Sequence, residues 1–302
     1  MVKLQKPQST VQAIYDNYEG RQGDSRRPHL GGSLIGDGCE RKLWYTFRWA
    51  RKIKHDGRLL KLFGRGHSEE FIFVRELRGV GVEVLEIDPA TGRQWTINDV
   101  RGHFGGSFDA VAKGLKEAPE TWHLVEMKTH NDKSFQDMLK KGVEKSKYQH
   151  FCQMQVYMYL GGLERAYYLA VNKNNDELYS ERIKLDVAIA KRLVAKAERI
   201  IDAPEPPLPA YSADWYLCKW CDFNEQCHKG AFSERNCRTC MHSTPVDDGK
   251  WTCNVGDPFK ISVKTQREGC SSHRFIPALV PHQQIDVVDN NIIYEGYKDD
   301  GK

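Results

Sequence analysis

The sequence lacks the long apolar segments that membrane proteins and secreted precursors carry. A transmembrane helix needs about 18 or more consecutive apolar residues, and no such run occurs in the 302 residues. The N-terminal segment MVKLQKPQSTVQAIYDNY has no apolar core of signal-peptide length. We therefore expect a soluble, cytoplasmic protein without a membrane partner.

Two other common patterns are also missing. The phosphate-loop pattern GxxxxGK[ST] does not occur, which excludes a nucleotide-driven motor of that type, and the chain has no internal repeat. The net charge is only +4, from 45 basic and 41 acidic residues. Because the two signs nearly cancel, the distribution of charge along the chain says more about binding partners than the total does.

Nine cysteines are present, although a reducing cytoplasm disfavours a disulfide framework. Three of them form the pattern C-x₂-C-x₅-C within CKWCDFNEQC: Cys218, Cys221 and Cys227. Soft-metal sites usually need four thiolate or imidazole ligands, so this cluster lacks one ligand. Spacing alone leaves both zinc and an iron–sulfur cluster open.

A second cysteine group follows in the spacing C-x₂-C-x₁₂-C-x₁₆-C. Its members are Cys237, Cys240, Cys253 and Cys270. This spacing is typical of structural zinc, with His273, and less favourably His242, as alternative ligands. The ninth thiol, Cys152, is expected to pack in the core.

Strand and helix patterns alternate along the middle of the chain and predict an α/β fold, a mixed sheet flanked by helices. Strands are expected at 82–87, 93–97, 102–114, 122–129, 165–173 and 177–185, the first two as a hairpin. Helices are expected within 39–78, 132–142 and 147–160, and after the capping residue Asp186.

Composition divides the chain into four parts. We predict an N-terminal extension at 1–30, polar and irregular apart from a short apolar periodicity, and a main domain at 31–232. A zinc-binding module at 233–281 and a flexible acidic tail at 282–302 follow. The proline-rich linker APEPPLPAY at 203–211 leads into the cysteine-rich part. A small module with little apolar content needs a metal to fold.

A compact polar site is predicted around two strands, in GGSFDAV and WHLVEMKT. Side chains alternate faces along a strand, so Glu126 and Lys128 point the same way, beside Asp109 on the preceding strand. Two carboxylates suit Mg²⁺ or Mn²⁺, and a metal there would polarise a phosphoryl oxygen and activate water. Lys128 could orient that water or neutralise charge in the transition state.

Basic residues are mixed with aromatic ones between Arg41 and Lys61, where eight Lys or Arg face a single acid, Asp56. This mixture suits a nucleic-acid surface, and a solvated helix face is the alternative. The candidate DNA-binding residues are Arg41, Lys42, Trp44, Arg48, Arg51 and Lys52.

The order of these signals resembles the RecB-type branch of the PD-(D/E)XK nucleases. A Gly-x-x-x-His-like element with His67 precedes GxxD, ExK and QxxxY. The resemblance implies that His67, Asp109 and Glu126 ligate the catalytic metal and that Lys128 assists the water. Gln153 and Tyr157 would support the site and contact DNA, although Gln155 and Tyr159 also satisfy the QxxxY spacing.

The same resemblance implies the missing cysteine ligand. In the iron–sulfur members of this branch, a cysteine in a C-x-R-K-x-W-like stretch precedes the nuclease motifs, and GCERKLWY supplies Cys39 here. A [4Fe–4S] cluster held by Cys39, Cys218, Cys221 and Cys227 would join the two ends of the nuclease domain. CRISPR-associated RecB-like exonucleases and AddB-type nuclease domains share this arrangement.

These observations predict a Mg²⁺- or Mn²⁺-dependent DNA exonuclease that acts on ends or single strands. The cysteine-rich tail resembles those of phage exonucleases, which implies a stand-alone phage or mobile-element enzyme in the host cytoplasm, with a recombination or replication protein as a possible partner. The alternatives are a CRISPR spacer-processing nuclease, a non-catalytic DNA-binding recombination factor and an iron–sulfur redox protein.

Overall fold

A five-stranded mixed sheet forms the centre of the main domain. The computed structural model describes residues 9–288 and 291–295. The strand order is β10-β9-β8-β7-β2, with β2 at Glu83–Leu85, β7 at Ala110–Lys113, β8 at His123–His130, β9 at Arg165–Asn172 and β10 at Leu178–Lys184. Only the β8–β9 pair is parallel in this sheet. The predicted mixed α/β fold is thus confirmed.

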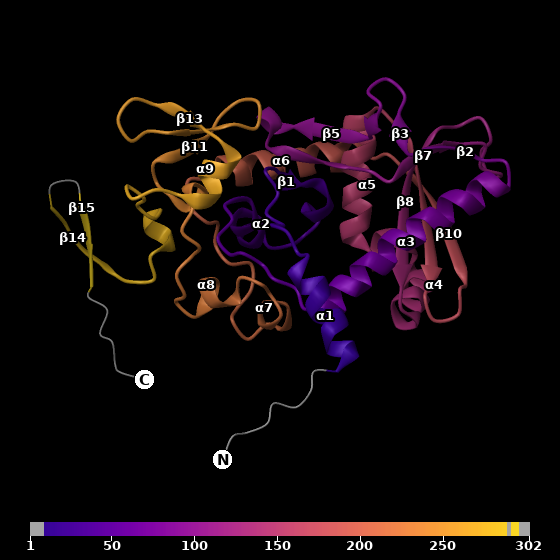
Figure 1. The fold of residues 1–302 in the computed structure, drawn as a ribbon. Coiled ribbons are helices and arrows are strands. Elements are labelled where there is room, and N and C mark those ends of the chain that lie inside the picture. Colours follow the sequence, from indigo (N-terminus) through magenta and orange to yellow (C-terminus); the bar gives the residue numbers. More distant parts are fainter. Residues whose placement is uncertain (1–8, 289–290, 296–302) are drawn as a thin grey trace, which may run out of the picture.

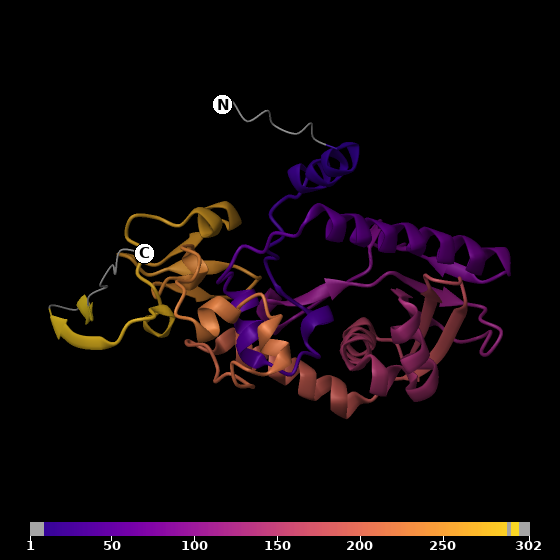
Figure 2. The same cartoon turned by 90° about the horizontal axis from the view of Figure 1, so that it is seen from below.

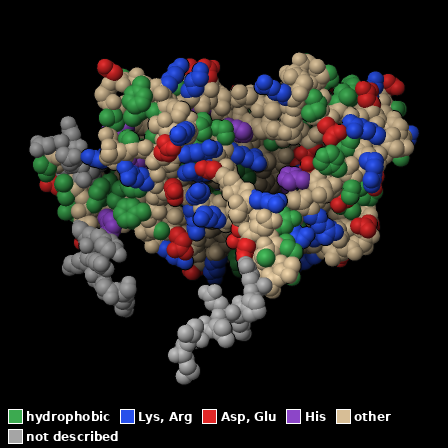
Figure 3. Space-filling model, in the orientation of Figure 1, with side chains coloured by type: hydrophobic (Ala, Val, Ile, Leu, Met, Phe, Trp, Pro, Cys, Tyr) green, Lys and Arg blue, Asp and Glu red, His purple; other side chains and the backbone are tan. Residues whose placement is uncertain are grey.

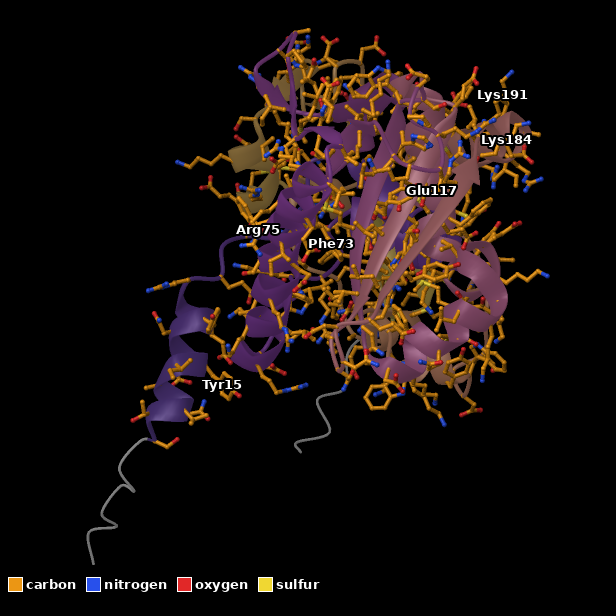
Figure 4. The ribbon with its side chains drawn as sticks, turned by 90° about the vertical axis from the view of Figure 1, so that its right-hand side faces the viewer. Tyr15, Phe73, Arg75, Glu117, Lys184 and Lys191 are labelled. Carbon is orange, nitrogen blue, oxygen red and sulfur yellow. The ribbon has the colours of Figure 1, made fainter. Side chains whose placement is uncertain are left out.

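Helices cover both faces of this sheet (Figures 1 and 2). The long helix α3 (Gly57–Gly79) lies on one face, and α4 (Asp132–Ser146) and α5 (Tyr148–Gly161) lie on the other, with α6 (Val187–Asp202) packed on α5. In Figure 4, Phe73 of α3 lies between its helix and the sheet, opposite the helices of the other layer. The Asp186 side chain caps α6, as predicted, by accepting a hydrogen bond from the backbone N–H of Ile189.

Strand alternation divides the core into two apolar clusters. Val125 and Met127 of β8 pack in the cluster that contains Phe73, whereas Leu124 packs in the larger cluster with α4, α5 and α6. Because alternate residues point to opposite faces, Glu126 and Lys128 face α5 rather than α3. The position of the polar site between the sheet and α5 follows from this alternation.

A smaller sheet continues from the main one. Its order is β1-β6-β5, with β1 at Leu30–Gly31, β5 at Thr96–Asp99 and β6 at Phe104–Ser107. The expected strand at 102–114 is therefore two strands in different sheets, which separate at Phe108 and Asp109. The expected 82–97 hairpin is confirmed only beside its turn, where β3 (Ile87–Asp88) pairs with β4 (Arg93–Gln94). β2 pairs with β7 and β5 with β6 instead.

The cysteine-rich region surrounds the N-terminal part of the domain (Figure 1). Its helices are α7 (Tyr216–Lys219), α8 (Asn224–His228) and α9 (Val263–Glu268), with 3₁₀ turns at Cys237–Thr239 and Pro277–Leu279. A three-stranded sheet contains β11 (Ser243–Pro245), β12 (Trp251–Cys253) and β13 (Phe259–Ile261). Near the N-terminus lie α1 (Thr10–Gly20), a 3₁₀ turn at Gly32–Leu34 and α2 (Glu40–Phe47), and a further 3₁₀ turn at Val100–Gly102 separates β5 from β6.

Arg238 joins the C-terminal region to the N-terminal segment. Its guanidinium lies 3.7 Å from the ring centroid of Trp49 and 4.7 Å from that of Trp251. It donates hydrogen bonds to the carbonyls of Phe47 (3.0 Å) and Pro28 (2.9 Å). Since Arg238 is fully buried, residues 233–281 pack against the main domain as part of it.

Both ends of the described chain contain regular structure. The N-terminal extension, expected to be irregular, contains α1, and the expected flexible tail contains a hairpin of β14 (Gln284–Val288) and β15 (Asn291–Tyr294). Residues 1–8, 289–290 and 296–302 of those two predicted parts lie outside the described residues. Across the part that is described, no helix combines the length and apolar character needed to cross a membrane.

Candidate active site

Glu126 is the central residue of the polar site. It lies in the middle of β8 and is fully buried. Gln153 Nε2 of α5 donates a hydrogen bond of 3.0 Å to Oε2 of Glu126, and the Lys128 ammonium forms an ion pair with Oε1. Of the two possible QxxxY registers, the one with Gln153 makes this contact. Gln155 instead binds the carbonyl of Lys184 and the backbone N–H of Asp186.

Asp109 lies beside Glu126 where β7 begins to pair with β8. Its Oδ2 accepts a hydrogen bond of 2.9 Å from the backbone N–H of Met127, which follows Glu126 on β8. The backbone pairing between β7 and β8 runs from Ala110 to Ala112. One residue before it, the side chain of Asp109 takes over by binding the backbone of β8. Its place is therefore fixed by the backbone of the strand that carries Glu126 and Lys128.

A third carboxylate, Glu70 of α3, belongs to the same cluster and was not singled out from the sequence. Burial raises the pKa of Glu70, and Asp109 adds to that rise. Glu70 lies one helical turn after His67, whose Nδ1 is 3.6 Å from Glu70 Oε1. Residues three apart share a helix face, so the spacing from His67 is the sequence signal that could have identified Glu70. The side chain of His67 is 78% exposed, and its contact with the cluster is the one with Glu70.

The charges of the site shift the pKa values of its members. Burial raises the pKa of Glu126 to about 7, Asp109 and Glu70 reinforce this, and Lys128 opposes it. For Lys128, burial lowers the pKa, but the carboxylates of Glu126 and Asp109 outweigh it and raise the value above the usual range. A cluster of three carboxylates with one ammonium is thus stable only when a proton or a further cation joins it.

Tyr157 supports the site from inside the protein. Its ring is 1% exposed, and burial raises its pKa, with Glu126 adding to the rise. Gly32 and Gly106 lie against this ring, so that a Cβ atom at Gly32 would be 2.5 Å from Tyr157 Cε1. Gln153 and Tyr157 are both buried, and their expected contact with DNA remains a prediction. Gln153 holds Glu126 through its hydrogen bond, and the Tyr157 ring packs on Gly32 and Gly106.

The donor chemistry of this site fits a divalent cation. Oε1 of Glu126 is buried and has no hydrogen-bond partner apart from its ion pair. Carboxylate oxygens with excess negative charge are the ligands that Mg²⁺ and Mn²⁺ prefer. In the described ranges, no three His, Cys, Asp or Glu side chains are already arranged around one metal position. The fit therefore rests on the donor set and its excess of negative charge.

Four cysteines from both ends of the domain line one small cavity. They are Cys39, Cys218, Cys221 and Cys227. Burial raises the pKa of Cys227, and the other three thiols add to the rise. Arg41, Lys42 and Tyr45 are also part of the lining. Four thiols at one cavity with two cations beside them are a donor set that fits an iron–sulfur cluster.

The second cysteine set also gathers in one region. Burial raises the pKa of Cys237 to about 11, with the thiols of Cys240, Cys270 and Cys253 adding to the rise. Cys240 Sγ accepts a bond from the backbone N–H of Arg274 at 3.4 Å. His273, the alternative ligand, packs edge-on against Phe275 and has its Nε2 3.4 Å from the hydroxyl of Thr239. These four thiols are the donor chemistry that structural zinc requires.

The basic and aromatic segment around α2 is mostly internal. Trp44 is fully buried with its Nε1 bonded to the carbonyl of Ala203, and Arg48 is 4% exposed between the rings of Trp44 and Trp251. The prediction that Trp44 and Arg48 bind DNA is therefore wrong, because neither presents a free face. The side chains that remain at the surface are those of Arg41, Lys42, Arg51 and Lys52. Cys152 is buried in the core, as expected.

Comparison with known proteins identifies one matching family. A sequence model of the PD-(D/E)XK nuclease superfamily matches residues 27–228, which are 202 of the 302 residues. No curated protein matches the chain. The alkaline exonuclease LHK-Exo from Laribacter hongkongensis is similar with a TM-score of 0.42 and 16% identity, over 61% of this chain and 90% of its own.

Two further solved structures show the same degree of similarity. LHK-Exo in complex with dAMP has a TM-score of 0.44 at 16% identity, over 61% of this chain and 90% of its own. The structure of SSO0001 has a TM-score of 0.42 at 16% identity, over 72% of this chain and 94% of its own.

Proposed function

The chain belongs to the PD-(D/E)XK nuclease superfamily, and on that basis we propose that it is a metal-dependent DNA exonuclease. The observation that carries the proposal is the pairing of Lys128 with the buried Glu126 beside Asp109. A binding protein would gain nothing from burying a carboxylate whose pKa is raised to about 7, whereas such perturbed groups are typical of active sites.

The proposed metal ligands are Asp109 and Glu126, with His67 as a third. A bound Mg²⁺ or Mn²⁺ would supply Lewis-acid activation of a phosphoryl oxygen and a water of lowered pKa. The residues of the chain provide the rest. Gln153 holds the orientation of Glu126, and the Lys128 ammonium stabilises negative charge that develops at the phosphate. Glu70 adds negative charge that favours cation binding.

We further propose that the cysteine sets hold two separate metal centres. Cys39, Cys218, Cys221 and Cys227 would hold a [4Fe–4S] cluster that joins the two ends of the domain. Cys237, Cys240, Cys253 and Cys270 would hold zinc. Both would be structural, because they lie outside the carboxylate cluster, and the first set also constrains segments far apart in sequence. The proposed setting is a phage or mobile-element enzyme that acts with recombination or replication proteins on DNA ends or single strands.

The test is cleavage of end-labelled DNA. Linear single- and double-stranded DNA and circular single strands are incubated with Mg²⁺, Mn²⁺ or EDTA. We expect metal-dependent degradation of linear DNA only, and a loss of about 10²-fold or more in Asp109→Ala, Glu126→Ala and Lys128→Ala. The control is Asp137→Ala, which removes an exposed carboxylate of α4 that pairs with Lys141. Cleavage of circular DNA would point to an endonuclease, and full activity of Glu126→Ala would refute the site.

A further inference from the structure

A basic cavity of about 240 Å³ lies between the segment 25–34 and the segment 46–55. Its lining contains three arginines and two histidines: Arg26, Arg27, His29, Arg51 and His55. No acidic side chain among the described residues lines it. A cavity of this size holds about eight water molecules at liquid volume, so a phosphate group fits with room for the sugar beside it.

Arg26, which lines the cavity, carries an unsatisfied donor. Its side chain is 9% exposed, and its Nη2 forms an ion pair of 2.6 Å with Asp24. Nη1 is buried and has no hydrogen-bond partner in the described part of the chain. A buried, charged donor without a partner costs about 1–3 kcal/mol or more, so Asp24 compensates the charge of Arg26 only in part.

Further cations gather around Trp49, which lines the cavity. The guanidinium carbons of Arg26 and Arg267 lie 5.3 and 5.8 Å from the ring centroid of Trp49, on which Arg238 also stacks. Asp24 contacts Arg26 and, at 3.4 Å, Arg267. One carboxylate therefore faces several guanidinium groups at this place. Buried charges are stable when they are paired, so the excess of positive charge calls for an anionic partner.

The cavity adjoins the carboxylate site. Gly31 and Ser33 line the cavity, and Gly32 between them packs on the ring of Tyr157. The guanidinium of Arg27 is close enough to oppose the rise in the pKa of Tyr157. Figure 3 shows Lys and Arg side chains gathered at the centre of the face, beside a hollow. A DNA strand bound at Glu126 can therefore also extend to this cavity.

We propose that this cavity binds a phosphate group of the substrate strand through Arg26, Arg27 and Arg51. Guanidinium groups match phosphate oxygens with paired donors, and Ser25, Ser33 and Thr46 place hydroxyls in the same lining. The identity of the ligand rests on the proposed nuclease function, whereas the positive cavity is a property of the fold. The phosphate is either the terminal group of the strand or an internal one.

The test measures binding without cleavage. Fluorescence anisotropy in EDTA compares single-stranded oligonucleotides with a 5′-phosphate, a 3′-phosphate or only hydroxyl ends, at several salt concentrations. The main variant is Arg27→Gln, whose side chain is exposed, and Arg26→Gln is the second. Arg93→Gln, an exposed arginine on the β3–β4 hairpin, is the control. Thermal melting establishes that each variant is folded.

We expect Arg27→Gln to weaken binding about tenfold, because a charged hydrogen bond is lost. The slope of log K against log salt should fall by about 0.7, the value for one phosphate contact on a single strand. If a 5′- or 3′-phosphate strengthens binding to the wild type but not to Arg27→Gln, the cavity holds that terminal group. A reduced slope with no effect of either end indicates an internal phosphate.

Unchanged affinity and slope in Arg27→Gln would overturn the proposal, and a folded Arg26→Gln must show the same losses. This outcome is distinct from failure of the proposed function. A protein that binds strands through Arg27 but cleaves none with Mg²⁺ or Mn²⁺ would keep the phosphate site and lose the nuclease assignment. A protein that cleaves DNA, but whose binding is unaffected by Arg27→Gln, would keep the nuclease assignment and lose the phosphate site.

Discussion

Gln153 of α5 donates a 3.0 Å hydrogen bond to the buried carboxylate of Glu126 on β8, so a helix side chain fixes the central residue of the site. The other oxygen of Glu126 faces Lys128. Because one oxygen is held by an uncharged amide and the other by an ammonium, the carboxylate has a single orientation. Its geometry is therefore set before any ligand arrives.

Gln153→Leu should weaken metal binding at the site, and so raise its Mg²⁺ requirement, without unfolding the protein. Loss of an outer hydrogen bond to a ligand costs about 10- to 100-fold in metal affinity, measured as the Mg²⁺ concentration for half-maximal cleavage. Gln155→Leu is the matched control, two residues along the same helix. Its loss should lower the free energy of unfolding by about 1–3 kcal/mol, since Gln155 holds the start of α6, and leave the Mg²⁺ requirement unchanged.

The metal-free protein should lose stability as the pH rises through about 7. Burial raises the pKa of Glu126 from 4.5 to about 7, so the folded state binds this proton more tightly than the unfolded chain. The contribution is present below pH 4.5 and is lost as the pH passes the folded pKa, by about 3 kcal/mol. Thermal melting in EDTA from pH 5 to 8 measures it, and Glu126→Gln should remove most of this dependence.

The same pKa predicts how the metal requirement responds to pH. A cation competes with the proton on Glu126, so the Mg²⁺ concentration for half-maximal cleavage should fall as the pH rises from 6 to 8. Saturating Mg²⁺ should restore the stability lost in EDTA above pH 7. A Mg²⁺ requirement independent of pH across this range would mean that Glu126 is not a ligand.

Cys39→Ser should remove the iron–sulfur absorbance as completely as Cys221→Ser does. The two residues are 182 positions apart but line one cavity, so loss of either leaves three thiolates. The protein should also melt at a lower temperature, because the link between the ends of the domain is opened. Cys152→Ser, a change to a buried thiol outside both sets, is the control and should keep its colour. Full iron content in Cys39→Ser would place the fourth ligand elsewhere.

Arg238→Met should destabilise the whole domain rather than the C-terminal region alone. The change leaves the carbonyls of Phe47 and Pro28 and the amide oxygen of Gln266 without their buried donor. At about 1 kcal/mol or more for each, the loss is about 3 kcal/mol, measured by urea unfolding. Lys260→Met, at an exposed position of β13, should have almost no effect. A separate early transition confined to the C-terminal region would contradict the shared core.

The sequence predicted the elements that depend on local pattern. The β9–β10 pair, α5 and the Asp186 cap follow from periodicity and from a capping residue. The alternation along β8 also placed Glu126 and Lys128 on one face. These features depend on residues within a few positions of one another, so short-range rules suffice for them.

What could not be predicted depends on contacts between distant segments. Basic residues mixed with aromatics are equally typical of a DNA surface and of arginines stacked on buried rings, and the structure has the second arrangement at Trp44 and Arg48. Glu70 joins the site because α3 packs on β8 and brings this carboxylate near Asp109 and Lys128. The break between β6 and β7 arises because β6 pairs with β1 in another sheet. The segment GHFGGSFDAVAKG contains no turn signal beyond its glycines, so the break could not be read from it.

The contact between Trp49 and Arg238 has a consequence for the order in which the chain can fold during synthesis. The two residues are 189 positions apart, and a ribosome adds about 5–20 residues per second. The segment around Trp49 therefore waits roughly 10–40 s for its partner after it has left the ribosome. During that interval the indole and its neighbouring rings are exposed, so a nascent chain arrested before residue 238 should bind chaperones there.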